Sequence, residues 1–399
     1  MTTKAFSLAC IAAILLLVGA VGLFNLVVDP YWYFRAVEIA GFNQIKQHAT
    51  GNERLVKPAL VNRLRPEAII LGNSVAEIGL PPTHRGFTNN GTLSSYNLAL
   101  PGASWNEIYC LAMFTLRQAG VKRLVIGISE VETGEREEAC PPDASFSRAD
   151  FGKLLFSRSA IAASRETMRQ QDLPEVMTRE GLWHFHRFDN ELNNDEQVAA
   201  VIAGQFRDRK CLAVPTQESK FDPARLQKKP VPLHEGASLR ALIRLARTKQ
   251  VELVFVFNPA HVLMSEIHRA CDGAESKWDA IWRVVSIVDQ EGDPLRTQVW
   301  NFGVYVPLNA EPPRDGKPKR DRLWQDMLHF NVPVGGVAFD AIYLGHPGYG
   351  ERVTVGNFEE VVARRESERT RFLRDNPWVR EELDLFARQV ANPPSKLPH

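Results

Sequence analysis

The N-terminal segment Ala5–Val28 constrains this chain most, because it is apolar nearly throughout and carries no charged side chain. A segment of this length can cross a bilayer as one helix. Lys4 precedes it and Asp29 follows it, so the positive-inside bias predicts a cytoplasmic N-terminus with the remainder outside. A cleaved signal peptide is the alternative, with Val18–Ala20 as a small-residue cleavage site. The apolar run continues past that site, which favours an uncleaved single-pass anchor.

Aromatic and basic residues follow the segment directly, in Tyr31–Arg35. Such residues are typical of the membrane–water interface, and we expect an aromatic belt there. The alternative is that these side chains pack on the globular part of the chain.

The composition excludes some classes of function. The chain has 399 residues, 44% of them hydrophobic, and a net charge of +1. It can bury a sizeable core, and about two domains are expected at this length. A balanced charge argues against a nucleic-acid partner, which usually requires a basic face. No glycine-rich phosphate loop is present, so we predict no nucleotide cofactor.

Neither the cysteines nor the histidines make a convincing metal site. No cysteine pair has the spacing of metal ligands. Cys140 and Cys211 flank an irregular region, so a disulfide between them is one possibility. We expect Cys110, in an apolar helical pattern, to be a buried thiol. His184 and His186 lie close to Asp189 and Glu191 in the sequence, which are suitable zinc ligands. Alternation in a polar segment accounts for them equally well, and we predict no metal.

Short apolar runs alternate with helical patterns over much of the chain, which predicts a parallel sheet with right-handed crossovers. The fold class is therefore α/β, a three-layer α/β/α sandwich with a mainly parallel, five-stranded sheet. The predicted strands are 68–71, 95–100, 123–128, 251–257 and 298–302. The predicted organisation is an anchor at 5–28, an α/β domain at 29–128 and 234–350, a mainly helical insertion or cap at 129–233, and a charged C-terminal helix and tail at 351–399.

The first predicted strand, Ala68–Leu71, ends in Gly72-Asn73-Ser74. Open α/β sheets place their ligands at the carboxyl ends of such strands, and a helix beginning near Val75 would favour negative charge beside Ser74. A serine nucleophile needs a base and a group that orients the base. Asp326 and His329 follow the last predicted strand, three positions apart, and we predict them to be the acid and the base of a Ser-His-Asp triad.

These motifs resemble the SGNH/GDSL hydrolase superfamily. Gly72–Ser74 is similar to the first block of that family, Gly102 to the glycine of the second, and Asp326 with His329 to the last, Asp-x-x-His. With the anchor and the stretch Asp29–Tyr31, the chain resembles a membrane-anchored bacterial subgroup that modifies exported polysaccharides by O-acetylation. The resemblance implies a cytoplasmic (inner) membrane location with a periplasmic domain.

The oxyanion donors implied by the resemblance are the N–H groups of Ser74 and Gly102. The third block of the family supplies an asparagine after the third strand, and here Gly127–Glu130 contains none. Ser129 substitutes for it, or Asn258 reaches in from the next strand; a turn at Asn258-Pro259 is the favoured interpretation. The altered block leaves slow turnover, transfer instead of hydrolysis, or no activity open.

The predicted function is a serine acyltransferase or esterase that acts on O-acyl groups of a cell-surface or exported polysaccharide. Its expected partners are the lipid bilayer, a carbohydrate substrate and a multi-pass membrane acyltransferase that delivers the acyl group. The alternative is a non-catalytic, membrane-tethered scaffold that binds glycan and keeps the fold. His261 and His346 either approach the site or, as we favour, are surface histidines.

Overall fold

We describe the fold from a computed structural model. The structure describes residues 2–129, 139–142, 145–146, 150–184, 221, 226, 231–312 and 322–391, with side chains up to 388. The described residues form two compact units. The anchor unit combines residues up to 65 with the described part of 141–187, and the sheet unit holds the rest. The predicted boundaries at 128/129 and 233/234 are not the boundaries of these units.

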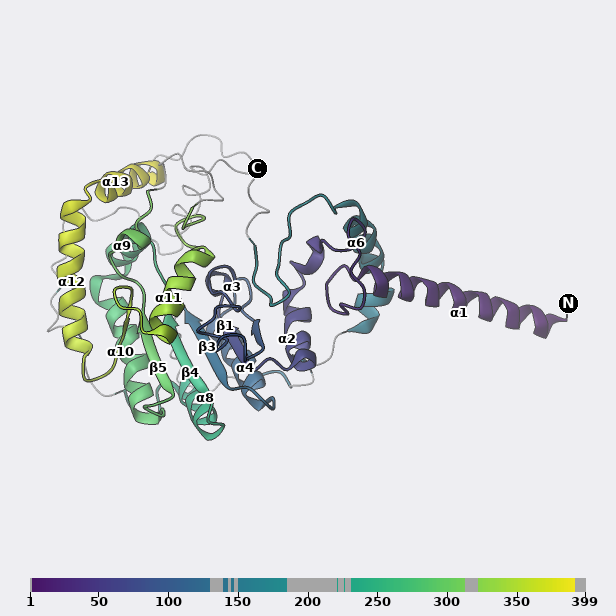
Figure 1. The fold of residues 1–399 in the computed structure, drawn as a ribbon, viewed down its shortest axis with the longest axis horizontal. Coiled ribbons are helices and arrows are strands. Elements are labelled where there is room, and N and C mark those ends of the chain that lie inside the picture. Colours follow the sequence, from purple (N-terminus) through teal and green to yellow (C-terminus); the bar gives the residue numbers. More distant parts are fainter. Residues whose placement is uncertain are drawn as a thin grey trace. The chain divides into compact units, whose positions relative to one another are not determined.

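The anchor unit is built on the long helix α1 (Thr3–Val28), drawn in purple in Figure 1. Its other elements are η1 (Gln47–Ala49), α2 (Glu53–Leu64), the short π-helix η2 (Gly152–Phe156) and α6 (Arg158–Arg169). Helix α1 is long and apolar enough to cross a membrane, and most of its side chains are exposed. Gly22, Asn25 and Val28 near its C-terminal end are buried within the unit. This agrees with a single-pass anchor at the N-terminus.

A buried cluster of polar groups lies at the C-terminal end of α1. The carboxylate of Asp29 accepts hydrogen bonds from the backbone N–H groups of Tyr33 (2.9 Å) and Arg35 (2.7 Å). The Lys46 ammonium donates to the carbonyl oxygen of Val28 at 2.6 Å. Burial raises the pKa of Asp29 and lowers the pKa of Lys46, although the opposite charges partly offset each effect.

The aromatic residues after α1 pack inside the anchor unit. Tyr31, Trp32 and Tyr33 are all buried. Arg63 lies over the ring of Tyr33, 4.8 Å from its centroid. The predicted aromatic belt at Tyr31–Arg35 is therefore wrong for these three rings, because other residues of the anchor unit cover them. The alternative, that the side chains pack on the folded part of the chain, is correct for them.

The sheet unit contains one six-stranded sheet with the order β2-β1-β3-β4-β5-β6. The strands are β1 (Ala68–Leu71), β2 (Ser95–Asn97), β3 (Arg123–Ile128), β4 (Glu252–Phe257), β5 (Thr297–Asn301) and β6 (Glu351–Arg352). The first five are parallel, and β6 pairs with β5 in the antiparallel direction. Every residue of β1 is buried, as expected for a continuous apolar strand that is covered on both faces.

Helices pack around this sheet in groups. They are α3 (Ser74–Gly79), α4 (Trp105–Arg117), α8 (Ala237–Thr248), α9 (Val262–Asp272), α10 (Ala274–Glu291), η5 (Pro307–Asn309), α11 (Val332–Leu344), α12 (Phe358–Asp375) and α13 (Trp378–Ala391). Helix α8 packs against both α4 and α10, while α3 packs against α11 and α13 against α9 (Figure 1). The α/β class is as predicted. The five-stranded sheet is wrong by one strand, and the three-layer description leaves out the packing of α13 on α9.

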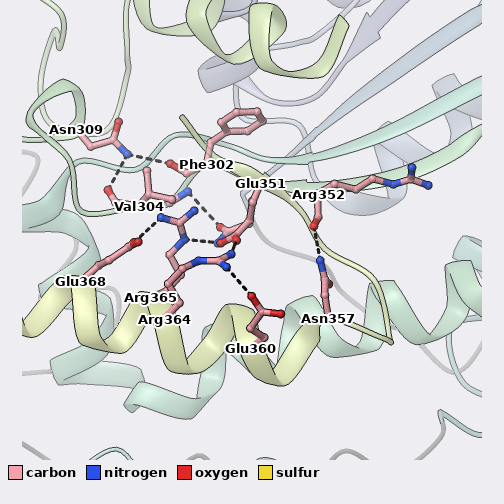
Figure 2. A network of polar contacts seen from close by, with 12 residues as sticks. Phe302, Val304, Asn309, Glu351, Arg352, Asn357, Glu360, Arg364, Arg365 and Glu368 are labelled. Atoms are coloured by element: carbon pink, nitrogen blue, oxygen red, sulfur yellow. Dashed lines mark hydrogen bonds and ion pairs between the residues drawn. The ribbon is translucent and has the colours of Figure 1, made fainter. Parts of the chain in front are cut away.

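The missed strand, β6, is held by charge rather than by apolar packing. Figure 2 shows the Glu351 carboxylate between the guanidinium groups of Arg364 and Arg365 on α12. Arg364 also pairs with Glu360 at 3.1 Å, one turn earlier on the same helix. A strand of two charged residues has no hydrophobic pattern, so the sequence gives no sign of it.

The disulfides differ from the prediction. Cys110 on α4 is bonded to Cys140, with a Cα–Cα distance of 5.3 Å. Cys271 is also disulfide-bonded. The predicted Cys140–Cys211 pair and the predicted free thiol at Cys110 are therefore both wrong. An apolar helical pattern reports that Cys110 is buried, but it does not report which cysteine lies beside it.

Candidate active site

The turn after β1 positions Ser74. Gly72 has a φ of +152°, and a β-carbon there would lie 2.6 Å from the β-carbon of Ala76 and 3.0 Å from the carbonyl oxygen of Gly127. A side chain does not fit, so glycine allows the first turn of α3 to lie close to β3. Asn73 caps α3, its side-chain oxygen accepting from the N–H of Val75 at 3.1 Å. Ser74 is thus the first residue of α3 and is half-buried.

Asp326 and His329 lie in one closed loop. Trp324 and Phe330 form an antiparallel bridge at its two ends, and the N–H of Gln325 donates to the carbonyl oxygen of His329 at 2.9 Å. Trp324 and Phe330 are fully buried. Apolar burial at both ends therefore holds the intervening acid and base in one fixed turn.

The structure brings Ser74, His329 and Asp326 together in one chain of hydrogen bonds. Ser74 Oγ lies 2.9 Å from Nε2 of His329, and Nδ1 of His329 lies 2.8 Å from Oδ2 of Asp326. Because an ionised carboxylate only accepts, Nδ1 donates its proton to Asp326, which leaves Nε2 free to accept from the serine hydroxyl. This is the arrangement of a nucleophile, a base and a group that orients the base.

Asp326 is held in its ionised form. Its side chain is almost fully buried, which by itself would raise its pKa. The facing His329 imidazole and the backbone N–H groups of Leu328 (3.0 Å) and His329 (2.8 Å) outweigh burial and hold the pKa of Asp326 below its usual value. The carboxylate therefore stays charged at neutral pH beside the imidazole that it orients.

Close packing between α3 and the loop sets the distance from Ser74 to His329. A β-carbon at Gly79, the last residue of α3, would lie 2.1 Å from the ring of Phe330. A β-carbon at Gly335 on α11 would lie 1.9 Å from the carbonyl oxygen of Gly79. Both glycines thus leave room for α3 to lie against the Phe330 end of the loop and the start of α11. These contacts place the serine within hydrogen-bond reach of the imidazole.

Gly102 lies in a turn beside the same strand end. The N–H of Leu100 donates to the carbonyl oxygen of Gly72 at 3.1 Å, which holds the segment after β2 against the turn before Ser74. The N–H of Ala103 then bonds back to Leu100, and Gly102, after a proline, has a φ of +63°. Pro followed by a glycine with positive φ is typical of a tight turn. Within the described ranges, the backbone N–H groups of Gly102 and Ser74 donate to no backbone carbonyl in the turns and loops.

Ser129 and Asn258 meet beside Asn73. Nδ2 of Asn258 donates to Ser129 Oγ at 3.3 Å, and Ser129 Oγ donates to the side-chain oxygen of Asn73 at 3.4 Å. The same oxygen of Asn73 caps α3. The structure thus brings both alternatives for the third donor into one polar chain that ends next to Ser74. Sequence reasoning missed Asn73 as the link, although an asparagine just before a helix is a common capping signal.

The sequence also missed the groups that support the loop. The Glu311 carboxylate accepts from the backbone N–H groups of Leu323 (2.8 Å) and Trp324 (3.1 Å). His261 lies 5.2 Å from the Trp324 ring, and its Nε2 donates to the carbonyl oxygen of Glu311 at 2.9 Å. His261 is fully buried, so the predicted surface position is wrong. Burial lowers its pKa to about 4. The sequence signal that could have indicated a structural role for His261 is its position directly before α9.

His346 does not join the site. His346 is exposed and faces Asp340, 3.7 Å away. His184 is described, but His186, Asp189 and Glu191 lie outside the described residues. In the part of the chain that the structure describes, no three His, Cys, Asp or Glu side chains gather in a group that could hold a metal ion.

No known family model matches this chain, and no curated protein matches its sequence. The geometry at Ser74 therefore carries the functional argument.

Proposed function

We propose that the chain is a serine-dependent acyltransferase or esterase. The observation that carries the proposal is the chain of hydrogen bonds from Ser74 through His329 to Asp326, at 2.9 and 2.8 Å. Each bond lies in the range of a true hydrogen bond, and Ser74 stays partly accessible. A hydroxyl, an imidazole and a buried carboxylate in this order can carry out acyl transfer.

The reaction would proceed in two halves. In the first, Ser74 Oγ attacks the ester carbonyl while Nε2 of His329 takes the hydroxyl proton. The C–O bond to the leaving alcohol then breaks, and His329 gives that alcohol its proton, which leaves an acyl group on Ser74. In the second half, His329 takes the proton of an incoming hydroxyl, which attacks the acyl group. The C–O bond to Ser74 then breaks, and His329 returns the proton to Ser74 Oγ. Asp326 stabilises the imidazolium in both halves.

The developing oxyanion needs donors placed before the reaction begins. The free N–H groups of Ser74 and Gly102 are the proposed donors. We assign a role to the two hydrogen bonds that run from Asn258 through Ser129 to Asn73: they hold the turn that carries the Ser74 N–H. An asparagine amide acting directly on the oxyanion is not required in this assignment.

The acceptor and the location are proposed as follows. The resemblance to membrane-anchored SGNH/GDSL proteins favours a sugar hydroxyl of an exported or cell-surface polysaccharide as acyl acceptor, or an O-acyl group of such a polysaccharide as acyl donor, and a multi-pass acyltransferase as partner. Disulfides persist in oxidising compartments, so the Cys110–Cys140 bond supports a location of the sheet unit outside the cytoplasm.

A fluorophosphonate probe tests the nucleophile in the full chain, kept in detergent micelles. We expect Ser74 Oγ to form a bond to phosphorus as fluoride leaves. The variant Ser74→Ala should not be labelled, while Ser159→Ala, which removes an exposed hydroxyl on α6, should react like the native chain. Labelling that survives in Ser74→Ala would remove the proposed nucleophile. A folded chain that neither reacts nor cleaves acetyl esters would favour the non-catalytic glycan-binding scaffold.

A further inference from the structure

An exposed aromatic pair lies beside α1 where a bilayer would end. Phe151 and Phe156, at the two ends of η2, are 52% and 50% exposed. Single exposed aromatic side chains are ordinary, but two that flank one short helix next to a candidate membrane span are not. The predicted belt residues Tyr31–Tyr33 are buried, so they do not fill this role.

The length of α1 fixes the level of this pair relative to a bilayer. A hydrocarbon core of about 30 Å takes about 20 helical residues. Counted from Ala5, the first residue after Lys4, such a stretch ends at Phe24. The next residue, Asn25, is polar and buried: its Nδ2 donates to the carbonyl oxygen of Leu155 at 2.6 Å. The boundary of the hydrocarbon therefore lies just before Asn25.

The short helix η2 lies at this boundary. A β-carbon at Gly22 would lie 2.6 Å from the Phe156 ring, so that ring rests directly on α1 within the last turn of the membrane-spanning stretch. Phe151, at the other end of η2, stacks on Phe34, with ring centroids 6.0 Å apart. The Phe156 ring thus lies at the depth where aromatic side chains favour the membrane interface, and Phe151 is exposed at the other end of the same short helix.

Charged side chains flank the same surface. Lys153 lies between Phe151 and Phe156 in the sequence, is 73% exposed and pairs with the half-exposed Asp150 at 3.5 Å. Arg158 begins α6 directly after η2 and is also exposed. Basic side chains next to exposed aromatic rings are the composition of segments that lie in the interface plane of a bilayer.

We propose that η2 and the start of α6 form a membrane-contact surface, with Phe151 and Phe156 inserted at the headgroup level and Lys153 and Arg158 facing phosphates. The occupant is the lipid bilayer that surrounds α1. This surface would hold the anchor unit down on the membrane instead of leaving it on a free stalk. The contact is independent of any chemistry at Ser74.

Lipid photocrosslinking tests the surface on the full native chain. The chain is placed in phospholipid nanodiscs that contain a lipid with a diazirine close to its headgroup, and adducts are mapped by mass spectrometry after digestion. We expect adducts on α1 up to Phe24 and on the segment Phe151–Phe156. Leu173 is the internal control, because it is an apolar side chain of comparable exposure, 45%, that belongs neither to η2 nor to the start of α6.

Adducts confined to α1, or equal labelling of Phe151–Phe156 and Leu173, would overturn the proposal. So would labelling of Phe151–Phe156 only when another protein is present. As a second measurement, the variant Phe151→Ala/Phe156→Ala should lower the adduct yield on residues 150–158 roughly tenfold, with the α1 adducts unchanged. Leu173→Ala, the matched variant, should leave both yields unchanged. Thermal unfolding followed by circular dichroism shows whether each variant is folded. If a variant is not folded, the adduct map of the native chain alone tests the proposal.

Discussion

Ser74 Oγ and His329 Nε2 lie 2.9 Å apart although 255 positions separate the two residues in the chain. The serine is fixed by the capped turn at the start of α3, and the imidazole is fixed by a loop with buried ends. Phe330, at one of those ends, packs on Gly79 at the other end of α3. Packing that excludes even a methyl group therefore sets the distance on which the proposed chemistry depends.

Asp326→Asn should slow fluorophosphonate labelling by about 10³- to 10⁴-fold. The amide keeps an acceptor for the backbone N–H groups, but its NH₂ faces Nδ1 of His329 and favours the tautomer that cannot take the serine proton. Asp340→Asn is a matched control, because Asp340 also faces a histidine, His84, at 3.1 Å. It should leave the rate of labelling unchanged. Equal losses in both variants would contradict the proposed role of Asp326.

Ser129→Ala and Asn258→Ala should each slow labelling, by on the order of tenfold to a hundredfold. Both residues act through one chain of hydrogen bonds that ends on the oxygen capping α3. The double variant should therefore lose no more than the larger single loss. The measurement is the second-order rate of labelling for the three variants and the native chain. Multiplying losses would indicate two independent oxyanion donors instead of one chain.

Gly335→Ala and Gly336→Ala should shift stability in opposite directions. At Gly335 a methyl group meets the Gly79 carbonyl oxygen, and overpacking of this kind costs about 1–3 kcal/mol. At Gly336 nothing lies within 4 Å, so alanine should stabilise α11 by about 0.5–1 kcal/mol. Chemical denaturation of the full chain measures both, and labelling should slow only in Gly335→Ala. A neutral Gly335→Ala would show that α3 is not packed as tightly as described.

His261 should make the protein less stable as the pH falls from about 6.5 to about 4. The folded pKa, about 4, lies below the usual 6.5, so the unfolded chain binds more protons between these values. The contribution of His261 to the free energy of unfolding is thus fully present above the pKa of the unfolded state. It is lost as the pH falls towards the pKa of the folded state, by roughly 3 kcal/mol in all. His261→Asn keeps an acceptor at the start of α9 but does not titrate, so its stability should vary less over this range. The exposed His234 provides the control: His234→Asn should retain the native pH dependence.

The sequence predicted the parts of the site that depend on local pattern. Continuous apolar runs give the bounds of β1 and β3 as the structure has them, because both faces of these strands are covered. The capped turn at Ser74 and the spacing of Asp326 and His329 are equally local. The sequence could not place these segments together, since the contact of Gly79 with Phe330 depends on packing between distant elements.

The errors have the same physical origin. Cys110 looks like a buried thiol because a disulfide depends on which cysteine lies nearby in space. His261 looks like a surface residue because its burial comes from the loop that carries Glu311 and Trp324. Strand β6 has no hydrophobic pattern of its own; it pairs with β5, and the arginines of α12 bind its Glu351.

The bridge between Trp324 and Phe330 closes the loop that carries Asp326 and His329, so the loop alone holds these two residues in place relative to each other. Any displacement of this loop as a rigid body would leave the distance from His329 to Asp326 intact and change only the distance from His329 to Ser74. The loop itself therefore sets the surroundings of the His329–Asp326 pair, and the packing of α3 against the loop and α11 sets the alignment of His329 with Ser74. Substitutions within the loop would act on the pair, and substitutions where α3 packs on α11 would act on the alignment.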